Sequence, residues 1–376
     1  MTSTAAFGPG AIALSVAVAP PDEGGGVIDV KVASTRPVGF STALFVNRPA
    51  DEIPALVGRL HALCGLSHTA AAAMAIAAAR GRDASAEAAA RFDGLLAERL
   101  GEHLRSTFLG PAGAPPGEVP RDMLADLRVV LAATRELVTA AGRTPANEPH
   151  RDAIERARAA VSRLGPALDA TGALRLPPAS WAAGVAERFG PASGDVHLDA
   201  DPLTGADDTT IVAALAADPT GFAAHPRFSG RRPETGPLAR AAARGPIEAG
   251  RRLDARLAEI AAAVDLLAAP AAARRRALAD WVDAVAIDGH TGCAAVESPR
   301  GRLHHLVRLD GIGRVAFYAI LAPTEWNFGP DGPFAATIRA NRPTADEAGR
   351  ARVERIAAAF DPCVGFAVTV EERQRA

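Results

Sequence analysis

Two apolar, β-branched runs, 11–19 and 27–34, stand near the start of the chain. The sequence Pro-Pro-Asp-Glu-Gly-Gly-Gly separates them, which predicts a turn between two strands of an antiparallel ribbon. Towards the other end, residues 292–322 alternate apolar and polar side chains around Asp310-Gly311, a dipeptide typical of hairpin turns. We therefore expect small β elements near both ends of the chain.

Apolar residues at intervals of three and four predict helices through most of the remaining sequence. The first, 52–80 with Asp51 as N-cap, places Cys64 and His68 four residues apart on one face of the helix or at its end. The last delivers Cys363 just past its end. The predicted helices after the first cover 84–108, 120–142, 148–164, 244–267, a short stretch to Ala286, and 344–360. The expected fold class is mainly α with small β elements (α+β).

Composition and charge narrow the function classes. The 376 residues are rich in alanine and carry a net charge of −2, which gives no electrostatic case for nucleic acid or for an acidic membrane surface. Residues 11–19 are too short to span a bilayer, and no uncharged apolar stretch of about 18 residues occurs elsewhere. Three cysteines without a signal sequence favour a reducing compartment, so we expect a cytoplasmic protein without membrane insertion. Residues 165–207, richer in Gly, Pro and Asp, are expected to form an irregular excursion.

Two short segments carry the candidate chemistry. Residues 59–68 have the sequence RLHALCGLSH, and residues 361–369 have the sequence DPCVGFAVT. They resemble the ligand motifs of nickel-iron hydrogenase large subunits, R-[IL]-C-G-x-C-x-x-x-H and D-P-C-x-x-C-x-x-H. Each segment keeps one cysteine, Cys64 or Cys363. The positions of the lost cysteines and of the terminal histidine are occupied by His61, Phe366 and Thr369.

Three further segments extend the resemblance over most of the chain. Residues 234–240 are similar to E-V-G-P-L-A-R, residues 297–305 (ESPRGRLHH) to E-A-P-R-G-x-L-x-H, and residues 323–327 (PTEWN) to P-T-T-W-N. The resemblance implies a single domain, 1–376, with a large-subunit-like helical core, an N-terminal β-ribbon and short C-terminal hairpins. It also implies that the two ligand motifs converge in the buried core.

The departures from the large-subunit pattern indicate an accessory protein. A four-thiolate bimetallic site cannot form, because a phenyl ring does not replace a soft thiolate ligand. The glutamate of the family's R-G-F-E is Ser41 here, and only seven residues follow Thr369, with no histidine to mark a cleavage site. The sequence is therefore similar to hydrogenase accessory proteins of the HupK/HoxV type, which lack the full ligand set and serve as scaffolds. No complete nickel-iron site and no catalysis are expected.

The resemblance implies a metal role for Cys64 and Cys363 as ligands of a transient Fe(CN)2CO fragment; a free cysteine is otherwise a small buried apolar side chain. His61 is either a third ligand of the iron, a transient contact of a nickel ion, or a side chain that hydrogen-bonds a neighbour. His68 is expected to donate to a thiolate rather than to bind metal. Cys293 has no counterpart among the ligands and is expected to be buried filler.

The loops around the cysteines are expected to hold the cyanides. The resemblance places Arg300 over the iron, where its guanidinium offers several donors to anionic ligands, and its structural alternative is a salt bridge to Asp361 or Glu297. Asp361 sets the geometry of its loop. Pro323 and Thr324 belong to the loop that hydrogen-bonds the second cyanide, or else to an ordinary turn.

Four functional hypotheses remain open. The first is a non-catalytic scaffold that receives the Fe(CN)2CO fragment from maturation proteins and passes it to the catalytic large subunit. The second is a metal-free large-subunit mimic that docks maturation chaperones or the small subunit. The third is a relative of quinone-reductase subunits, against which the retained Asp-Pro-Cys and Pro-Thr-Glu-Trp-Asn strings argue. The fourth, a hydrogenase enzyme, lacks the required nickel thiolates.

Overall fold

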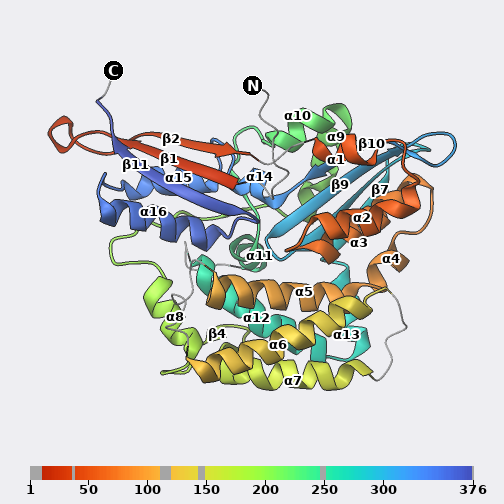
Figure 1. Ribbon diagram of the computed structural model, residues 1–376, viewed down its shortest axis with the longest axis horizontal. Coiled ribbons are helices and arrows are strands. Elements are labelled where there is room, and N and C mark those ends of the chain that lie inside the picture. The colour runs from red at the N-terminus through yellow and green to blue at the C-terminus, as the bar shows by residue number, and fades with distance from the viewer. Residues whose placement is uncertain (1–10, 36–38, 111–119, 143–148, 246–250, 375–376) are drawn as a thin grey trace, which may run out of the picture.

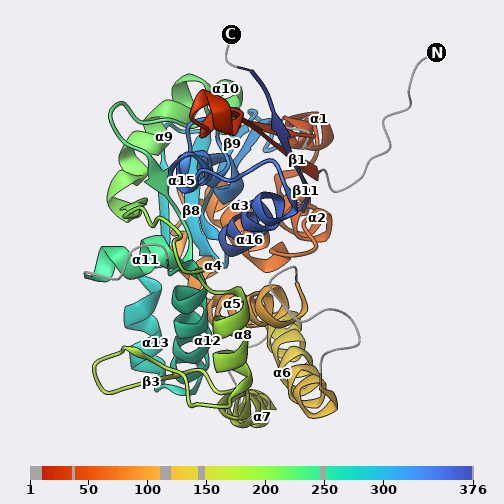
Figure 2. The same ribbon diagram turned by 90° about the vertical axis from the view of Figure 1, so that its left-hand side faces the viewer.

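The structure is a computed structural model that describes residues 11–35, 39–110, 120–142, 149–245 and 251–374. Two tiers stack on each other (Figure 1). The upper tier holds two β-sheets with their covering helices, one sheet on the left and one on the right. The lower tier is a layer of helices, and Figure 2 shows the same division from the side. Mixed helices and small sheets confirm the expected α+β class.

The left-hand sheet joins the two ends of the chain. Its central strand β1 (Ala11–Val18) pairs antiparallel with β2 (Val27–Ser34), as predicted, and parallel with β11 (Gly365–Glu372), which was not predicted. Alternate residues of β1 are buried against α15 (Pro333–Asn341) and α16 (Glu347–Phe360). The predicted ribbon is therefore two strands of a three-stranded sheet.

The right-hand sheet is antiparallel in the order β10-β9-β8-β7. Its strands are β7 (Val282–Ala286), β8 (Thr291–Ser298), β9 (Gly301–Leu309) and β10 (Val315–Leu321). The hairpins expected over 292–322 are present. The short helix predicted to reach Ala286 is present but already ends at Leu278, because Val282 and Val285 belong to an edge strand whose β-branched residues pair with β8. A Cβ on Gly292 would collide with the carbonyl oxygen of Ala75, so this glycine lets β8 approach the covering helix closely.

The predicted helix 52–80 is broken in two. α2 (Ile53–Leu60) and α3 (Gly65–Ala79) flank a short segment that carries the candidate site residues His61 and Cys64. Gly58 and Gly65 face each other across the two helices, since a Cβ on Gly65 would lie 2.6 Å from Gly58 O. Only glycine, which has no Cβ, permits such close packing. The contact fixes the direction in which the chain leaves α2. The alanine-rich α3 is buried against the right-hand sheet.

Most of the remaining predicted helices lie in the lower tier. The predicted helix 84–108 is divided into α4 (Ser85–Ala89) and α5 (Phe92–Leu104), and the predicted helix 344–360 is α16 of the upper tier. One apolar core is formed by α5, α6 (Arg121–Ala140), α7 (Pro149–Leu164) and α12 (Arg252–Ala268), whereas Ala88 of α4 belongs to the core of the right-hand sheet. A π-helical turn, Arg105–Leu109, follows α5. Turns of this kind are frequent at functional sites, because they redirect side chains at a helix end.

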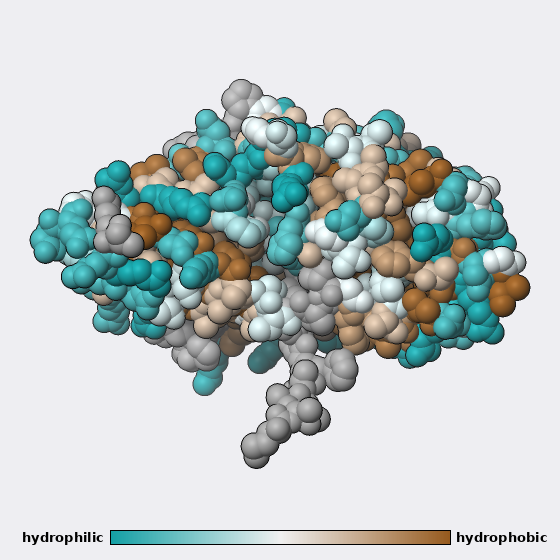
Figure 3. Space-filling view, turned by 90° about the horizontal axis from the view of Figure 1, so that it is seen from above, coloured by the Kyte–Doolittle hydropathy of each residue, from teal (hydrophilic) through white to brown (hydrophobic). Residues whose placement is uncertain are grey.

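Shorter elements complete the fold. They are α1 (Phe40–Phe45), α8 (Trp181–Phe189), α9 (Asp208–Ala217), α10 (Pro219–Ala224), α11 (Pro237–Arg244), α13 (Ala271–Leu278), α14 (Pro323–Asn327), the pair β3 (Ala167–Leu168) and β4 (Leu174–Arg175), and the pair β5 (Asp201–Pro202) and β6 (Pro233–Glu234). The stretch 165–207 contains α8, the pair of β3 and β4, the strand β5 and a 3-10 turn, Gly205–Asp207. None of the described helices combines the length and apolar character that a membrane crossing requires. On the upper side, apolar areas are separated by polar ones (Figure 3).

Candidate functional site

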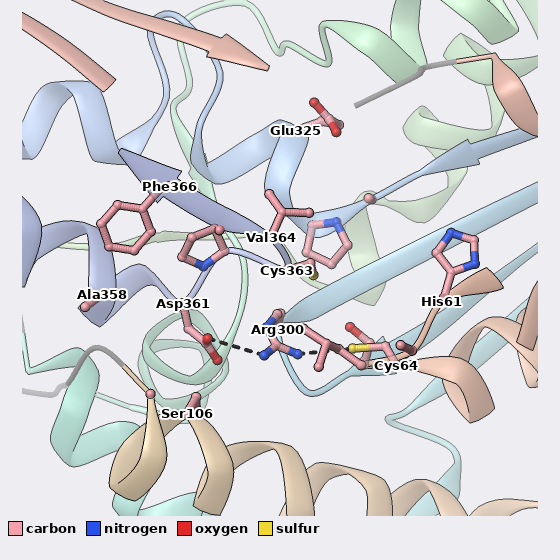
Figure 4. Close-up of a pocket in the computed structure, with 18 of the residues that line it drawn as sticks. His61, Cys64, Ser106, Arg300, Glu325, Ala358, Asp361, Cys363, Val364 and Phe366 are labelled. Carbon is pink, nitrogen blue, oxygen red and sulfur yellow. Dashed lines mark hydrogen bonds and ion pairs between the residues drawn. The ribbon is translucent and has the colours of Figure 1, made fainter. Parts of the chain in front are cut away.

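Two cysteines from opposite ends of the chain meet between the tiers. Cys64 is the N-cap residue of α3 and is 5% exposed, and Cys363 lies in the half-buried loop between α16 and β11. The Cys363 side chain is close enough to the Cys64 thiol to raise its pKa. Figure 4 shows both cysteines beside Arg300 in one pocket. The structure therefore shows that Cys64 and Cys363 lie close together, which their spacing in the sequence could not establish.

The position of Cys64 depends on a carboxylate from another helix. Glu98 of α5 accepts the N–H groups of Leu66 and Ser67 at 2.7 and 2.9 Å, as well as the Ser67 hydroxyl. These are orphan donors of the first turn of α3, and an acidic group there is also favoured by the helix dipole. Because Glu98 satisfies them, the Cys64 side chain does not have to cap the helix. Its sulfur can turn to the cavity.

Burial raises the pKa of Glu98 to about 7, against the hydrogen bonds from Ser67 and Leu66 that favour the charged form. Since the folded pKa lies above the unfolded value of 4.5, this group stabilises the fold most at low pH. We expect that contribution to be lost as pH rises through 7, by up to about 3 kcal/mol. Urea unfolding between pH 5 and 8.5 measures it, and Glu98→Gln should flatten this part of the profile; an unchanged slope would contradict the assignment.

Arg300 links the two cysteine loops. Its Nη1 donates to Cys64 Sγ at 3.3 Å and to Glu102 Oε2 at 3.2 Å, and its Nη2 donates to Asp361 Oδ1 at 3.4 Å. Of the two expected salt-bridge partners, the structure brings Asp361 to Arg300, while Glu297 pairs with Arg240 and Arg302 instead. The Nε atom of Arg300 is buried without a hydrogen-bond partner among the described residues. One donor of the guanidinium thus remains for a ligand.

The charges around Arg300 set the protonation of its neighbours. The hydrogen bond with Cys363 and burial raise the pKa of the Cys64 thiol well above its ordinary value, although Arg300 acts in the opposite direction. Burial would raise the pKa of Asp361, but the charges of Arg300 and Arg256 hold it below its usual range. Asp361 also has a left-handed backbone (φ 53°) at the end of α16, and the nearby Ser106 side chain favours the charged form of its carboxylate. The site therefore pairs a protonated Cys64 thiol with an ionised aspartate.

The loop that carries Arg300 is clamped by Arg240 of α11. Arg240 donates to Ser298 O at 3.2 Å and to Pro299 O at 2.9 Å. The same guanidinium binds both carboxylate oxygens of Glu259, at 2.6 and 2.7 Å. The segment similar to E-V-G-P-L-A-R thus holds the backbone from which Arg300 projects.

A row of histidines borders the cysteines. His61 Nδ1 donates to Val57 O at 2.9 Å, so in the neutral ring Nε2 is the nitrogen without a proton. The ring stacks on His68, with centroids 3.5 Å apart, and His68 Nδ1 is 2.9 Å from His305 Nε2. In the described part of the chain, no group of three or more His, Cys, Asp and Glu side chains is arranged to hold a metal ion.

A cavity of about 1360 Å³ opens beside the thiols. Phe366, at the position of the lost bridging cysteine, lines it with Pro323 and His61. Thr324 is buried at the start of α14 and is not among the described lining residues. Cys293 is buried in another apolar cluster, in agreement with its predicted filler role.

Some residues of the site were not anticipated from the sequence. They are Glu98, Glu102, Ser106 and Arg256. Glu98 and Glu102 lie four apart in a predicted helix, which indicates a shared face. Nothing in the sequence indicates that this face is buried, because the partners of both carboxylates come from distant segments.

Comparisons with known proteins relate this chain to hydrogenase proteins. The family model described as "Nickel-dependent hydrogenase" matches residues 248–369. "Hydrogenase expression/formation protein HupK" of Rhizobium leguminosarum bv. viciae is 38% identical over 91% of this chain and 93% of its own length. "Hydrogenase expression/formation protein HoxV" of Cupriavidus necator is 29% identical over 91% and 93%.

Solved structures support the fold. The NAD+-reducing [NiFe]-hydrogenase in its H2-reduced state aligns with a TM-score of 0.62 and 16% identity, covering 90% of this chain and 92% of that chain. A variant of the [NiFeSe] hydrogenase from Desulfovibrio vulgaris Hildenborough gives a TM-score of 0.57 and 16% identity, covering 90% and 93%. At these identities the likeness concerns the fold alone.

Proposed function

Since the chain belongs to the HupK/HoxV family of hydrogenase expression/formation proteins, we propose that it is a non-catalytic scaffold that holds an Fe(CN)2CO fragment through Cys64 and Cys363. Membership of this family implies a role in hydrogenase maturation. The finer proposal is that maturation proteins deliver the fragment and that the catalytic large subunit receives it.

One observation carries the proposal: two thiols, some 300 residues apart in sequence, line one cavity beside a buried guanidinium that donates to Cys64 Sγ. Thiolates are the soft ligands that such an iron unit requires, and two of them leave room for the fragment's own ligands. The unpartnered Nε of Arg300 is a donor suited to an anionic cyanide. Binding would displace the thiol protons, since the thiolate is the ligand form.

The remaining site residues support these ligands. Asp361 keeps Arg300 oriented towards the cysteines. His61 is proposed as a third ligand, oriented by its hydrogen bond to Val57 O and by stacking on His68. Pro323 and Thr324 are proposed to present backbone and hydroxyl groups to the second cyanide.

Infrared spectroscopy tests the scaffold. Protein purified anaerobically from a host with its maturation genes should give two cyanide bands and one carbonyl band. We expect Cys64→Ser and Cys363→Ser to lose these bands and the bound iron, because a neutral hydroxyl is a poor ligand for iron. Cys293→Ala is the matched control and should retain them, since Cys293 lies in a separate apolar cluster.

A blank spectrum in the wild-type protein, with iron also absent by elemental analysis, would overturn the scaffold. That result would favour the metal-free mimic that docks chaperones or the small subunit. Full support of hydrogenase maturation by a double Cys→Ser variant would point the same way.

A further inference from the structure

A buried chain of hydrogen bonds runs from the cavity into the right-hand sheet. His68 lines the cavity, and its Nδ1 lies 2.9 Å from Nε2 of His305 on β9. His305 Nδ1 in turn lies 2.6 Å from the hydroxyl oxygen of Tyr318 on β10. His305 and Tyr318 are both 0% exposed and are not among the described residues that line the cavity. The chain of hydrogen bonds therefore begins at the cavity and ends in the core.

The register of the sheet brings these side chains together. Ile320 lies opposite His305 in the pairing of β9 with β10, so Tyr318 is the diagonal neighbour of His305 on the same face. That face packs against α3, which carries His68. The neighbouring His304 points to the opposite face, where it hydrogen-bonds a carboxylate of α9. Of the two histidines, only His305 can therefore reach His68.

The Tyr318 hydroxyl fixes the direction of the hydrogen bonds. In the described part of the chain its oxygen has one hydrogen-bond partner, His305 Nδ1, so the hydroxyl proton is satisfied only if Tyr318 donates it. Burial raises the pKa of Tyr318 well above its ordinary value, which keeps that proton on the oxygen. In the reverse direction His305 Nδ1–H would donate to the oxygen, and a buried hydroxyl proton would be left without an acceptor.

The protons of both imidazoles follow from this bond. His305 Nδ1 accepts, and burial lowers the pKa of His305 well below its ordinary value, so the neutral ring carries its proton on Nε2. That N–H donates to His68 Nδ1. Since two N–H groups do not face each other at hydrogen-bond distance, His68 carries its own proton on Nε2. The two nitrogens of an imidazole point away from each other, so this N–H is directed away from His305.

The two stacked rings beside the thiols thus have opposite capacities. His61 in its neutral form keeps a lone pair on Nε2, because its Nδ1 donates to Val57 O. His68 stacks on it with ring centroids 3.5 Å apart, but its Nδ1 lone pair is used by His305 and its Nε2 carries a proton. One ring can therefore serve as a ligand, and the other can serve only as a donor.

We propose that Tyr318 and His305 are positioning residues that hold His68 as an N–H donor for the negative charge of the loaded site. When the iron unit binds, thiolates replace neutral thiols, and a hydrogen bond to a charged acceptor is stronger than one to a neutral acceptor. The fixed tautomer also keeps His68 from competing with Cys64 and Cys363 as a ligand. The inference rests on the proposed function, because the charge arises only on loading.

Nitrogen-15 NMR of the metal-free protein tests the chain of hydrogen bonds directly. In histidine-labelled protein we expect a protonated Nε2 and an unprotonated Nδ1 in both His68 and His305, assigned with His68→Gln and His305→Gln. In Tyr318→Phe the Nδ1 resonance of His305 should move downfield, because this nitrogen loses its hydrogen bond. A proton on Nδ1 of either ring would overturn the proposal. The measurement needs no iron, so its result is independent of the scaffold.

Infrared spectra of the loaded protein test the role of the donor. His305→Leu removes the group that fixes His68, and we expect it to lose iron at least about tenfold faster than wild type. Its cyanide and carbonyl bands should lie at lower wavenumber, because thiolates without the N–H donor leave more electron density on the iron. His305→Gln should restore wild-type behaviour, since its amide can accept from Tyr318 and donate to His68.

The outcomes separate this role from the scaffold. His304→Leu is the matched control, because it removes a buried histidine from the opposite face of the same strand, and it should leave the bands unchanged. Wild-type bands and iron retention in His305→Leu would overturn the positioning role and leave the scaffold intact. Bands absent from wild type would overturn the scaffold and with it this role, whereas the NMR spectra would still report the tautomers.

A second pair of variants decides if His305→Leu does not fold. In His305→Gln combined with Tyr318→Phe, no hydroxyl orients the amide, so His68 should populate both tautomers and the infrared bands should split or broaden relative to His305→Gln alone. Identical bands in these two variants would overturn the role of Tyr318.

Discussion

Arg300→Met should lower the free energy of unfolding by about 3–5 kcal/mol. The substitution removes the cation that Glu102 and Asp361 share. Buried Glu102 then keeps only its ion pair with the partly exposed Arg105, and the described residues give Asp361 no other ion pair. An ion left unpaired in such surroundings costs far more than the intact pair contributes. Urea denaturation measures the change. The same variant should lose the infrared bands of the loaded protein, because the donor next to Cys64 is gone.

Two further variants separate charge from packing. In Arg300→Met combined with Glu102→Gln, part of the lost stability should return, because one of the two carboxylates that lost the Arg300 ion pair is neutralised. Arg156→Met removes an arginine from an exposed pair with Glu136, and it should cost no more than about 1 kcal/mol. An Arg300→Met variant as stable as Arg156→Met would show that the buried cluster does not depend on this cation.

The sequence predicted the elements whose signals are local. The ribbon, the hairpins and the long helices follow from apolar spacing and turn residues, and the structure confirms them. β11 was not predicted, because its partner β1 lies some 350 residues away in the sequence and nothing in residues 365–372 alone specifies that pairing. The break between α2 and α3 was not predicted for a similar reason. It depends on Gly58 facing Gly65 and on a carboxylate from α5, which are tertiary contacts.

In the candidate site, too, residues with a local sequence signal could be predicted and residues placed by tertiary contacts could not. Cys64 and Cys363 could be singled out because each retains part of a motif, and the resemblance implied that they meet. The cations and carboxylates around them could not be assigned in this way. Of the two salt-bridge partners considered for Arg300, only Asp361 approaches it, because Glu297 is held by Arg240 and Arg302. Partner choice among buried charges is decided by packing, which residue types alone do not specify.

Arg240→Met is expected to cost at least about 3–5 kcal/mol at neutral pH. Arg240 is bound to Glu259 through two hydrogen bonds and to Glu297 through one, and it also holds two carbonyl groups of the Arg300 loop. Burial would raise the pKa of Glu259, but the charges of Arg240 and Arg99 keep it well below 4.5. Without Arg240 the burial effect should dominate, and the pKa of Glu259 should rise.

The pH dependence identifies the cause of this loss. In wild type the low pKa of Glu259 gives stability that is present above pH 4.5 and is lost only as pH falls further. In the variant the raised pKa of Glu259 makes its ionisation costly at neutral pH, and this cost disappears as pH falls through the raised pKa. The difference in unfolding free energy should therefore narrow between pH 7 and pH 4. Arg244→Met, one turn later on the exposed face of α11, should change stability by less than about 0.5 kcal/mol. A difference that stays constant with pH would mean that Arg240 acts through packing and the loop carbonyls, and that the charge of Glu259 is stabilised by His103 and Arg99 alone.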